Sequence, residues 1–163
     1  MPGPIVRFCI QQILEGLDAM HDNDIAHCDI KPQNCMLNGD LEIKLGDFES
    51  SAHPMNAVSG LRGTMGYMPP EIKNEVYDGK CADYFALGVS SFVMLMGKPM
   101  FAKASFSDRH YKHILNNDFD SFWKAHKNLA PSTPFRDFVE RFVESDPEHR
   151  IQCSDEVRAH PWM

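Results

Sequence analysis

A carboxylate, an ammonium and an amide lie within a short stretch of the chain, residues 27–34. Phosphoryl transfer uses these three groups. A carboxylate such as Asp29 orients an attacking hydroxyl and accepts its proton, an ammonium such as Lys31 neutralises charge on the moving group, and the amide oxygen of Asn34 can bind magnesium. The same residue types are common in loops that do no chemistry. The cluster by itself leaves both interpretations open.

A second acidic group, Asp47, follows a predicted β-hairpin. Asn38 and Gly39 separate two short apolar runs and favour a two-residue type I′ turn, because both residues tolerate a positive φ. In that register Asn34 lies opposite Ile43, and Asp47 lies four residues beyond the pair. A bend after the second strand would bring Asp47 back to Asn34, so that both share one magnesium ion. The alternative is that Asp47 only caps or turns a loop.

The elements that must position these groups are mainly helical. Apolar residues recur at helical spacing from Val6 and predict an amphipathic helix that residues 21–24 end. Residues 85–96 are too short to cross a bilayer, which takes about 20 residues, and predict a buried core helix. Further helices are expected over residues 108–115 and after Thr133, with Thr133 as the cap and Pro134 in the first helical position. Residues 50–66 show no apolar period and predict one long loop.

The composition excludes several classes of protein. A formal charge of -7 without a run of Lys or Arg argues against nucleic acid and anionic membranes as partners. The first residues lack a secretory signal, so we expect an intracellular, by default cytoplasmic, protein. Five widely spaced cysteines favour reduced thiols over disulfides or zinc. At 163 residues one core suffices, and we expect a single domain over residues 1–163.

The order of several motifs resembles the eukaryotic protein kinase family, of serine/threonine type. Residues 27–34 are similar to its catalytic loop, and Asp47-Phe48-Glu49 is similar to its DFG motif with the glycine replaced. Residues 63–71 look like the end of an activation segment with the APE motif, residues 83–88 like the start of the central helix, and residues 146–162 like the last helices. The resemblance spans nearly the whole chain.

The resemblance implies a role for each matching position. Asp29 would be the base and Lys31 the phosphate contact, while Asn34 and Asp47 would bind magnesium. The implied activation segment contains Ser59 and Thr64, and Thr64 would bond Asp29 and Lys31.

Three more positions take structural roles from the resemblance. Asp83 would brace the backbone of the catalytic loop. Glu71 would pair with Arg150 as a buried ion pair, where loss of one partner strands a charge.

Three departures from the family pattern change what the resemblance implies. No segment matches the glycine-rich loop or the strand lysine of the N-terminal lobe, so we expect an N-lobe to be absent. Cys28 stands where most such kinases have Arg, and a thiol cannot pair with a phosphorylated activation segment; it is either a small buried apolar residue or a redox group. Glu49 replaces a glycine whose backbone angles a side chain penalises.

The expected fold is mainly α: a kinase C-lobe-like helical bundle with a small β-hairpin at the catalytic-loop edge. The favoured function is a catalytically inactive binding or structural module. The alternative is the catalytic half of an active serine/threonine kinase whose N-lobe lies outside this sequence. ATP and magnesium are the cofactors if the protein is active, and neither is expected to bind tightly to this chain alone. A protein partner is expected on the face that an N-lobe normally covers.

Overall fold

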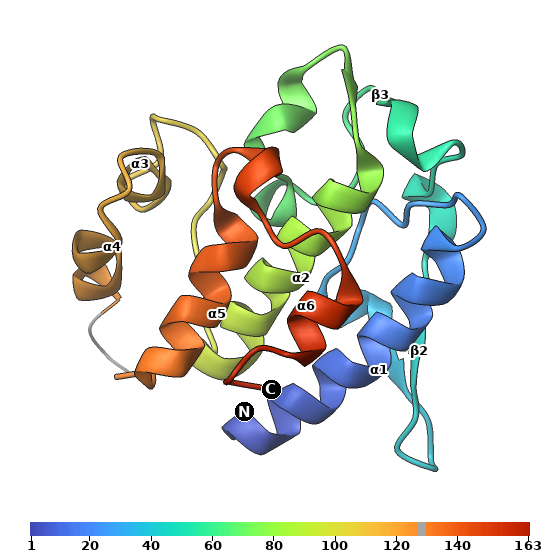
Figure 1. The fold of residues 1–163 in the computed structure, drawn as a ribbon, viewed down its shortest axis with the longest axis horizontal. Helices are drawn as coiled ribbons and strands as arrows, with labels where there is room; N and C mark the ends of the chain where they lie inside the picture. Colours follow the sequence, from blue (N-terminus) through green and yellow to red (C-terminus); the bar gives the residue numbers. More distant parts are fainter. Residues whose placement is uncertain (127–129) are drawn as a thin grey trace.

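Helices surround one central helix in the computed structural model, which describes residues 1–126 and 130–163 (Figure 1). The α-helices are α1 (Gly3–His21), α2 (Gly79–Met96), α3 (Tyr111–Leu115), α4 (Phe119–Ala125), α5 (Thr133–Val143) and α6 (Ser154–Arg158). Two antiparallel pairs of short strands are present, β1 (Cys35–Leu37) with β2 (Ile43–Leu45) and β3 (Val58–Ser59) with β4 (Val76–Tyr77). The mainly helical fold predicted from the sequence is confirmed.

Helix α2 forms the centre of the core. Its N-terminus is capped by the Asp78 side chain, which accepts a hydrogen bond from the Cys81 amide, and Gly97 ends it in the left-handed conformation. Phe85 and Phe92 are fully buried. A side chain at Gly88 would collide with Phe142 of α5, so this glycine allows the two helices to pack closely. The predicted core helix is confirmed, and it begins six residues earlier than expected.

Helix α1 supports the β1–β2 hairpin through one side chain. The Gln12 amide oxygen accepts a hydrogen bond from the Ile43 amide at 2.7 Å, and its amide nitrogen donates to the Leu41 carbonyl at 3.2 Å. Gly16 of the same helix lies against the Leu45 side chain. The hairpin is therefore fixed against a helix whose apolar face belongs to the core. No helix in the described part of the chain is long and apolar enough to span a membrane.

The predicted hairpin register is wrong. Leu37 pairs with Ile43, so five residues rather than two connect the strands. The Asn38 side chain accepts hydrogen bonds from the amides of Asp40 and Glu42, and Leu41 takes the positive φ of 63°. Because the Asn38 side chain bonds the backbone of this longer loop, the type I′ turn is not formed.

Two predicted helix starts are also shifted. Helix α3 begins at Tyr111 rather than Asp108, because the Asp108 carboxylate accepts hydrogen bonds from backbone amides on both sides of it and closes a loop there. Helix α5 has Ser132 as its N-cap, so Thr133 and Pro134 each lie one position further into the helix than expected. The segment expected to be one long loop, residues 50–66, contains strand β3 and short 3₁₀ turns.

A buried ion pair joins the segment before β4 to the C-terminal region. The Arg150 guanidinium donates to both carboxylate oxygens of Glu71, at 2.6 and 3.1 Å. It also donates to the backbone carbonyls of Glu144 and Cys81 and lies over the Phe85 ring, 4.9 Å from its centroid. All five guanidinium hydrogens are used, which is what makes burial of this charge tolerable.

Removal of either charge of this pair is expected to destabilise the fold. Glu71→Ala or Arg150→Ala should lower the free energy of unfolding by about 3–5 kcal/mol, because the remaining charge is left buried. Urea denaturation measures this loss. Lys44→Ala is the matched control, since it breaks an exposed pair with Glu42 and should cost less than about 1 kcal/mol. Equal effects in the three variants would show that the buried pair is not a stability element.

Candidate functional site

Asp83, buried in the first half of α2, holds the loop that follows α1. Its two carboxylate oxygens accept hydrogen bonds from the backbone amides of His27, at 2.8 Å, and Cys28, at 2.7 Å. The His21 ring, at the end of α1, lies 2.9 Å from the same carboxylate. Cys28 has a φ of 63°, a conformation that costs energy in a residue other than glycine. The Asp83 hydrogen bonds stabilise this conformation, as the resemblance implied for Asp83.

Further along this loop, three predicted site residues come together with a fourth, Thr64, from a later segment. Lys31 Nζ lies 2.7 Å from Asp29 Oδ2 and 2.8 Å from the Thr64 hydroxyl. The Asn34 side-chain amide donates to Asp29 Oδ2 at 3.1 Å and to the Asp29 carbonyl at 2.9 Å. One carboxylate oxygen of Asp29 is therefore held in place from two sides. The other, Oδ1, is buried and has no hydrogen-bond partner within the described residues.

The ionisation of Asp29 follows from these contacts. Burial by itself works to raise the pKa of this carboxyl, but the hydrogen bond and positive charge of Lys31, together with hydrogen bonds from Thr64 and Asn34, outweigh it. The Thr64 hydroxyl acts in the same direction, and the pKa of Asp29 lies below its ordinary value. At neutral pH Asp29 is a carboxylate, the form that accepts a proton.

The corrected hairpin register places Asp47 near Asn34. The Gly46 amide donates to the Asn34 carbonyl at 3.0 Å, so Asp47 follows a residue that is hydrogen-bonded to Asn34. The His27 ring bonds the Gly46 carbonyl at 3.1 Å and packs against Phe48, which fixes the same segment from the other side. The backbone before Asp47 is therefore bonded to that of Asn34, through a strand pairing different from the predicted one, and the shared binding of magnesium stays a prediction.

The residues at this position fit magnesium in the kind of donor they offer. The Asn34 amide nitrogen is used by Asp29, which leaves the Asn34 amide oxygen, and Asp47 contributes an exposed carboxylate. Oxygen donors of this kind suit Mg²⁺, which usually takes one or two protein ligands and completes its shell with phosphate and water. Residues 1–126 and 130–163 contain no cluster of three or more His, Cys, Asp and Glu side chains that could hold a metal.

The backbone strain expected at Glu49 lies two residues earlier. Asp47 has the left-handed conformation, with φ 63° and ψ 69°, whereas Glu49 lies in a 3₁₀ turn with an ordinary φ. Replacement of the family glycine by Glu49 therefore costs no backbone strain in this conformation. The Glu49 side chain is exposed.

Arg62 is a charged residue beside the loop that sequence reasoning missed. Its guanidinium donates to the backbone carbonyls of Ser50, Ser51 and Ser59, at 3.3–3.4 Å, and lines a small crevice with Cys28. Two features of the sequence could have indicated this role for Arg62. Cys28 stands where most such kinases have Arg, and Arg62 is the arginine nearest to Thr64 in the sequence. Burial raises the pKa of the Cys28 thiol to about 12, so it is neutral at pH 7. Ser59 itself lies exposed on β3.

Gly63 allows the segment around Thr64 to reach the loop. It has a φ of +91°, and a β-carbon at this position would collide with the Cys28 carbonyl. Only glycine combines this conformation with so close an approach. Thr64 thereby comes within hydrogen-bond distance of Lys31.

We expect Asp83→Asn to destabilise the loop. The Asn side chain has one acceptor oxygen, whereas the backbone N–H groups of His27 and Cys28 each donate to a separate oxygen of Asp83. One buried amide hydrogen loses its partner, which should lower the free energy of unfolding by about 1–3 kcal/mol in urea denaturation. Asp78→Asn on the same helix is the control. It keeps a good N-cap and should change stability by only a few tenths of a kcal/mol. An equal loss in both variants would contradict the role of Asp83.

Comparison with known proteins gives one family. The sequence matches the protein kinase domain over residues 2–163. The whole of this chain aligns, at 35% identity, with 34% of serine/threonine-protein kinase ULK3 of Rattus norvegicus. It is 35% identical to an Aurora kinase of Schizosaccharomyces pombe (94% of this chain, 42% of that protein) and 31% identical to calcium/calmodulin-dependent protein kinase type 1 of Caenorhabditis elegans (94% and 44%).

The chain thus spans less than half the length of each of these curated relatives. The match includes the loop around Asp29, the segment around Thr64 and the central helix α2. Together with the helical C-lobe-like fold, it establishes that this chain belongs to the protein kinase domain family.

Proposed function

We propose that this chain contributes the metal-binding and acceptor half of a serine/threonine protein kinase active site, and that the isolated chain does not transfer phosphate. The observation that carries the proposal is the contact network of Asp29, Lys31, Asn34 and Thr64, held by Asp83. A binding module under no selection for catalysis has no need of a buried carboxylate with one oxygen left unpaired.

The chain's own residues would act at defined atoms. The hydroxyl of a Ser or Thr acceptor would donate its hydrogen bond, and then its proton, to the Asp29 carboxylate, while the hydroxyl oxygen forms a bond to phosphorus and the bond to the nucleotide diphosphate breaks. Lys31 would neutralise charge on the transferred group, and Thr64 keeps Lys31 in position. Asn34 and Asp47 would hold magnesium, which supplies charge neutralisation for the nucleotide phosphates.

The nucleotide itself needs further contacts. Phosphoryl transfer depends on positioning, and in this family a separate lobe covers the adenine and the phosphates. We propose that such a lobe, from another segment or another protein, completes the site. A cytoplasmic location is part of the proposal, because the five cysteines of this chain are free thiols.

A second candidate function is a non-catalytic binding module. Exposed apolar side chains on and after the hairpin favour it: Met36, Leu37, Leu41 and Phe48 are all more than half exposed. A cavity of about 350 Å³ between α1 and β2 adjoins Phe48. An exposed apolar surface of this kind favours a protein partner, and a nucleotide-binding lobe is one partner that would satisfy both candidate functions.

The isolated chain is expected to bind magnesium-ATP with a dissociation constant above about 1 mM, because Asn34 and Asp47 offer metal ligands without an adenine pocket. Isothermal titration calorimetry measures this. Submillimolar binding that Asp47→Ala abolishes would contradict the proposal that another lobe is needed.

With a kinase N-terminal lobe added, phosphorylation of a Ser/Thr peptide should appear, and Asp29→Asn should lower its rate by about 10²–10⁴. Asp40→Asn in the exposed hairpin loop is the control. No phosphorylation in any such complex would leave the binding-module function.

Phe48→Asp is expected to weaken association with that lobe by about tenfold or more, because an apolar anchor at the centre of an interface becomes charged. Phe48 is 55% exposed, so the free chain should keep most of its thermal stability and lose only the contact of Phe48 with the His27 ring. Phe106→Asp is the matched control, since Phe106 is also exposed and belongs to the segment before α3, a helix on the opposite side of the molecule from the hairpin (Figure 1). Equal losses of affinity would show that the hairpin surface is not the contact.

A further inference from the structure

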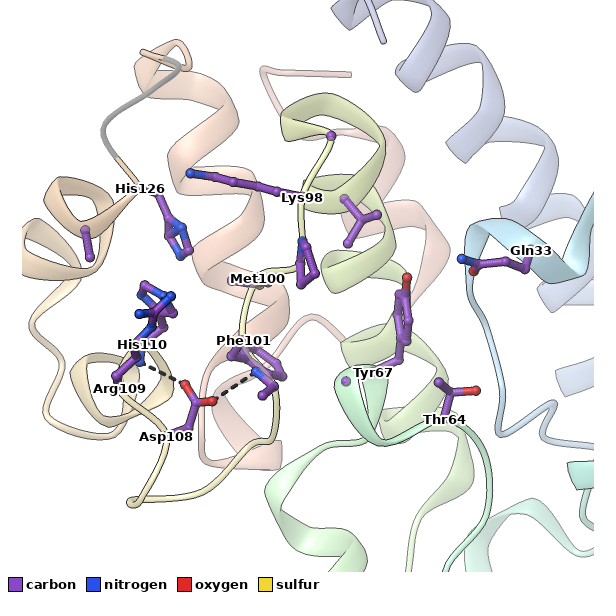
Figure 2. Close-up of a pocket in the computed structure, with 16 residues that line it drawn as sticks. Gln33, Thr64, Tyr67, Lys98, Met100, Phe101, Asp108, Arg109, His110 and His126 are labelled. Atoms are coloured by element: carbon purple, nitrogen blue, oxygen red, sulfur yellow. Dashed lines mark hydrogen bonds between the residues drawn. The ribbon is translucent and has the colours of Figure 1, made fainter.

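A cavity of about 900 Å³ opens beside the site and extends past the C-terminal end of α2 to His110 and His126 (Figure 2). Gln33 and Thr64 line it at one end, next to the Lys31–Asp29 pair. Met100 and Phe101 line its middle. The cavity is much larger than one side chain and is continuous with the acceptor end of the site. A polypeptide whose hydroxyl reaches Asp29 can therefore place a neighbouring residue in it.

The far end of this cavity carries a cluster of cationic and titratable groups, which we term the cationic wall: Lys98, Arg109, His110 and His126 (Figure 2). Among the described residues that line the cavity, Asp108 is the one carboxylate. Its oxygens are occupied by backbone amides, those of Ala102 and Lys103 on one side and of His110 and Tyr111 on the other, at 2.8–3.3 Å. Within residues 1–126 and 130–163, the positive charges of the wall therefore lack a dedicated counter-ion, in a protein whose formal charge is -7.

The two histidines of the wall are stacked and incompletely hydrogen-bonded. Their ring centroids lie 4.4 Å apart. The His126 side chain is 3% exposed, and neither its Nε2 nor His110 Nδ1 has a hydrogen-bond partner within residues 1–126 and 130–163. Arg109 donates to His110 Nε2 at 3.0 Å, so Nδ1 is the nitrogen that carries the hydrogen of a neutral His110. Buried polar atoms of this kind are uncommon, and they lie beside a cavity that a ligand can enter.

The positive potential of the wall also affects these rings. Burial lowers the pKa of His126 to about 4, and the charge of Lys98 adds to the effect. The pKa of His110 is likewise lowered, by burial and by the charge of Arg109, although the charge of Asp108 works to raise it. Lys98 and His113 act on His110 in the same direction as Arg109. A negative charge in the cavity would relieve this potential and raise both pKa values.

We propose that the cavity binds an acidic side chain, Asp or Glu, of the polypeptide that the site phosphorylates, with its carboxylate at the cationic wall. The inference rests on the proposed function in taking the ligand to be the acceptor polypeptide. Lys98 and Arg109 supply charge-assisted hydrogen bonds to the carboxylate. Met100 and Phe101 contact the apolar part of the same segment. In an acidic protein, a local positive surface at the end of a cavity also selects acidic ligands against basic ones.

The test is binding of short fluorescent peptides to the 163-residue chain without nucleotide, followed by fluorescence anisotropy. Each peptide has one Ser, with Glu residues either before or after it, and each has a matched peptide with Gln in place of Glu. One of the Glu peptides is expected to bind about tenfold or more tightly than its Gln counterpart. Lys98→Gln/Arg109→Gln should remove that difference, whereas Lys44→Gln/Lys80→Gln, far from the cavity, should keep it. Equal binding of Glu and Gln peptides, or equal loss in both double variants, would overturn the proposal.

A second readout reports on the wall itself. In histidine ring NMR, the bound Glu peptide should raise the pKa of His126 from about 4 toward its ordinary 6.5. An unchanged His126 pKa at saturation would place the peptide elsewhere and overturn the assignment. Binding of a phosphoserine peptide without binding of the Glu peptide would also overturn it.

Nucleotide is absent from these experiments, so the result does not depend on phosphoryl transfer. If the Glu peptide binds as expected but no complemented chain phosphorylates it, the cavity assignment stands and the proposed function fails. A Ser→Ala version of the peptide should bind equally well, because the hydroxyl is not the anchoring group. If phosphorylation is observed but shows no preference for Glu over Gln peptides, the function stands and the cavity assignment fails.

Discussion

The carboxylate of Asp83 is the contact on which the rest of the site depends. It is buried in the most apolar helix of the fold, and both of its oxygens are directed to the backbone of the loop that carries Asp29. A charged group in such a place is tolerated only because two amides and the His21 ring surround it. Core packing and the geometry of the loop are therefore coupled: the loop holds its shape because the packed helix α2 fixes Asp83, and α2 can bury Asp83 because the loop binds it.

A second constraint is the distribution of positive charge around the loop. Lys31 neutralises Asp29. Cys28, by contrast, is a neutral residue at the position where most kinases of this family have Arg. Arg62, from the segment before Thr64, lies beside Cys28 and bonds three carbonyls of its own segment. The segment is thus held by a cation within it, through neutral carbonyl acceptors, and this contact requires no phosphate group.

The two sides of the molecule offer different chemistry to partners. The hairpin side is apolar and exposed around Phe48, which suits a protein surface of similar character. The cavity side joins the loop to the cationic wall and suits an acidic polypeptide. Both arise from the same arrangement, in which α2 separates the hairpin from helices α3 and α4 (Figure 1).

The sequence by itself determined the helical fold, the central helix and the contact groups of the loop. Apolar periodicity reports burial directly, and the spacing of Asp29, Lys31 and Asn34 is short enough for the local chain to bring them together. Tertiary structure decided what depends on groups distant in the sequence. The hairpin register followed from the Asn38 side chain and the support of Gln12, the strain moved from Glu49 to Asp47, and Arg62 reached Cys28 only through the folded segment. The cationic wall has the same origin, because residues 98–126 carry no motif and acquire their shared potential only when α3 and α4 fold against the aromatic side chains of α2.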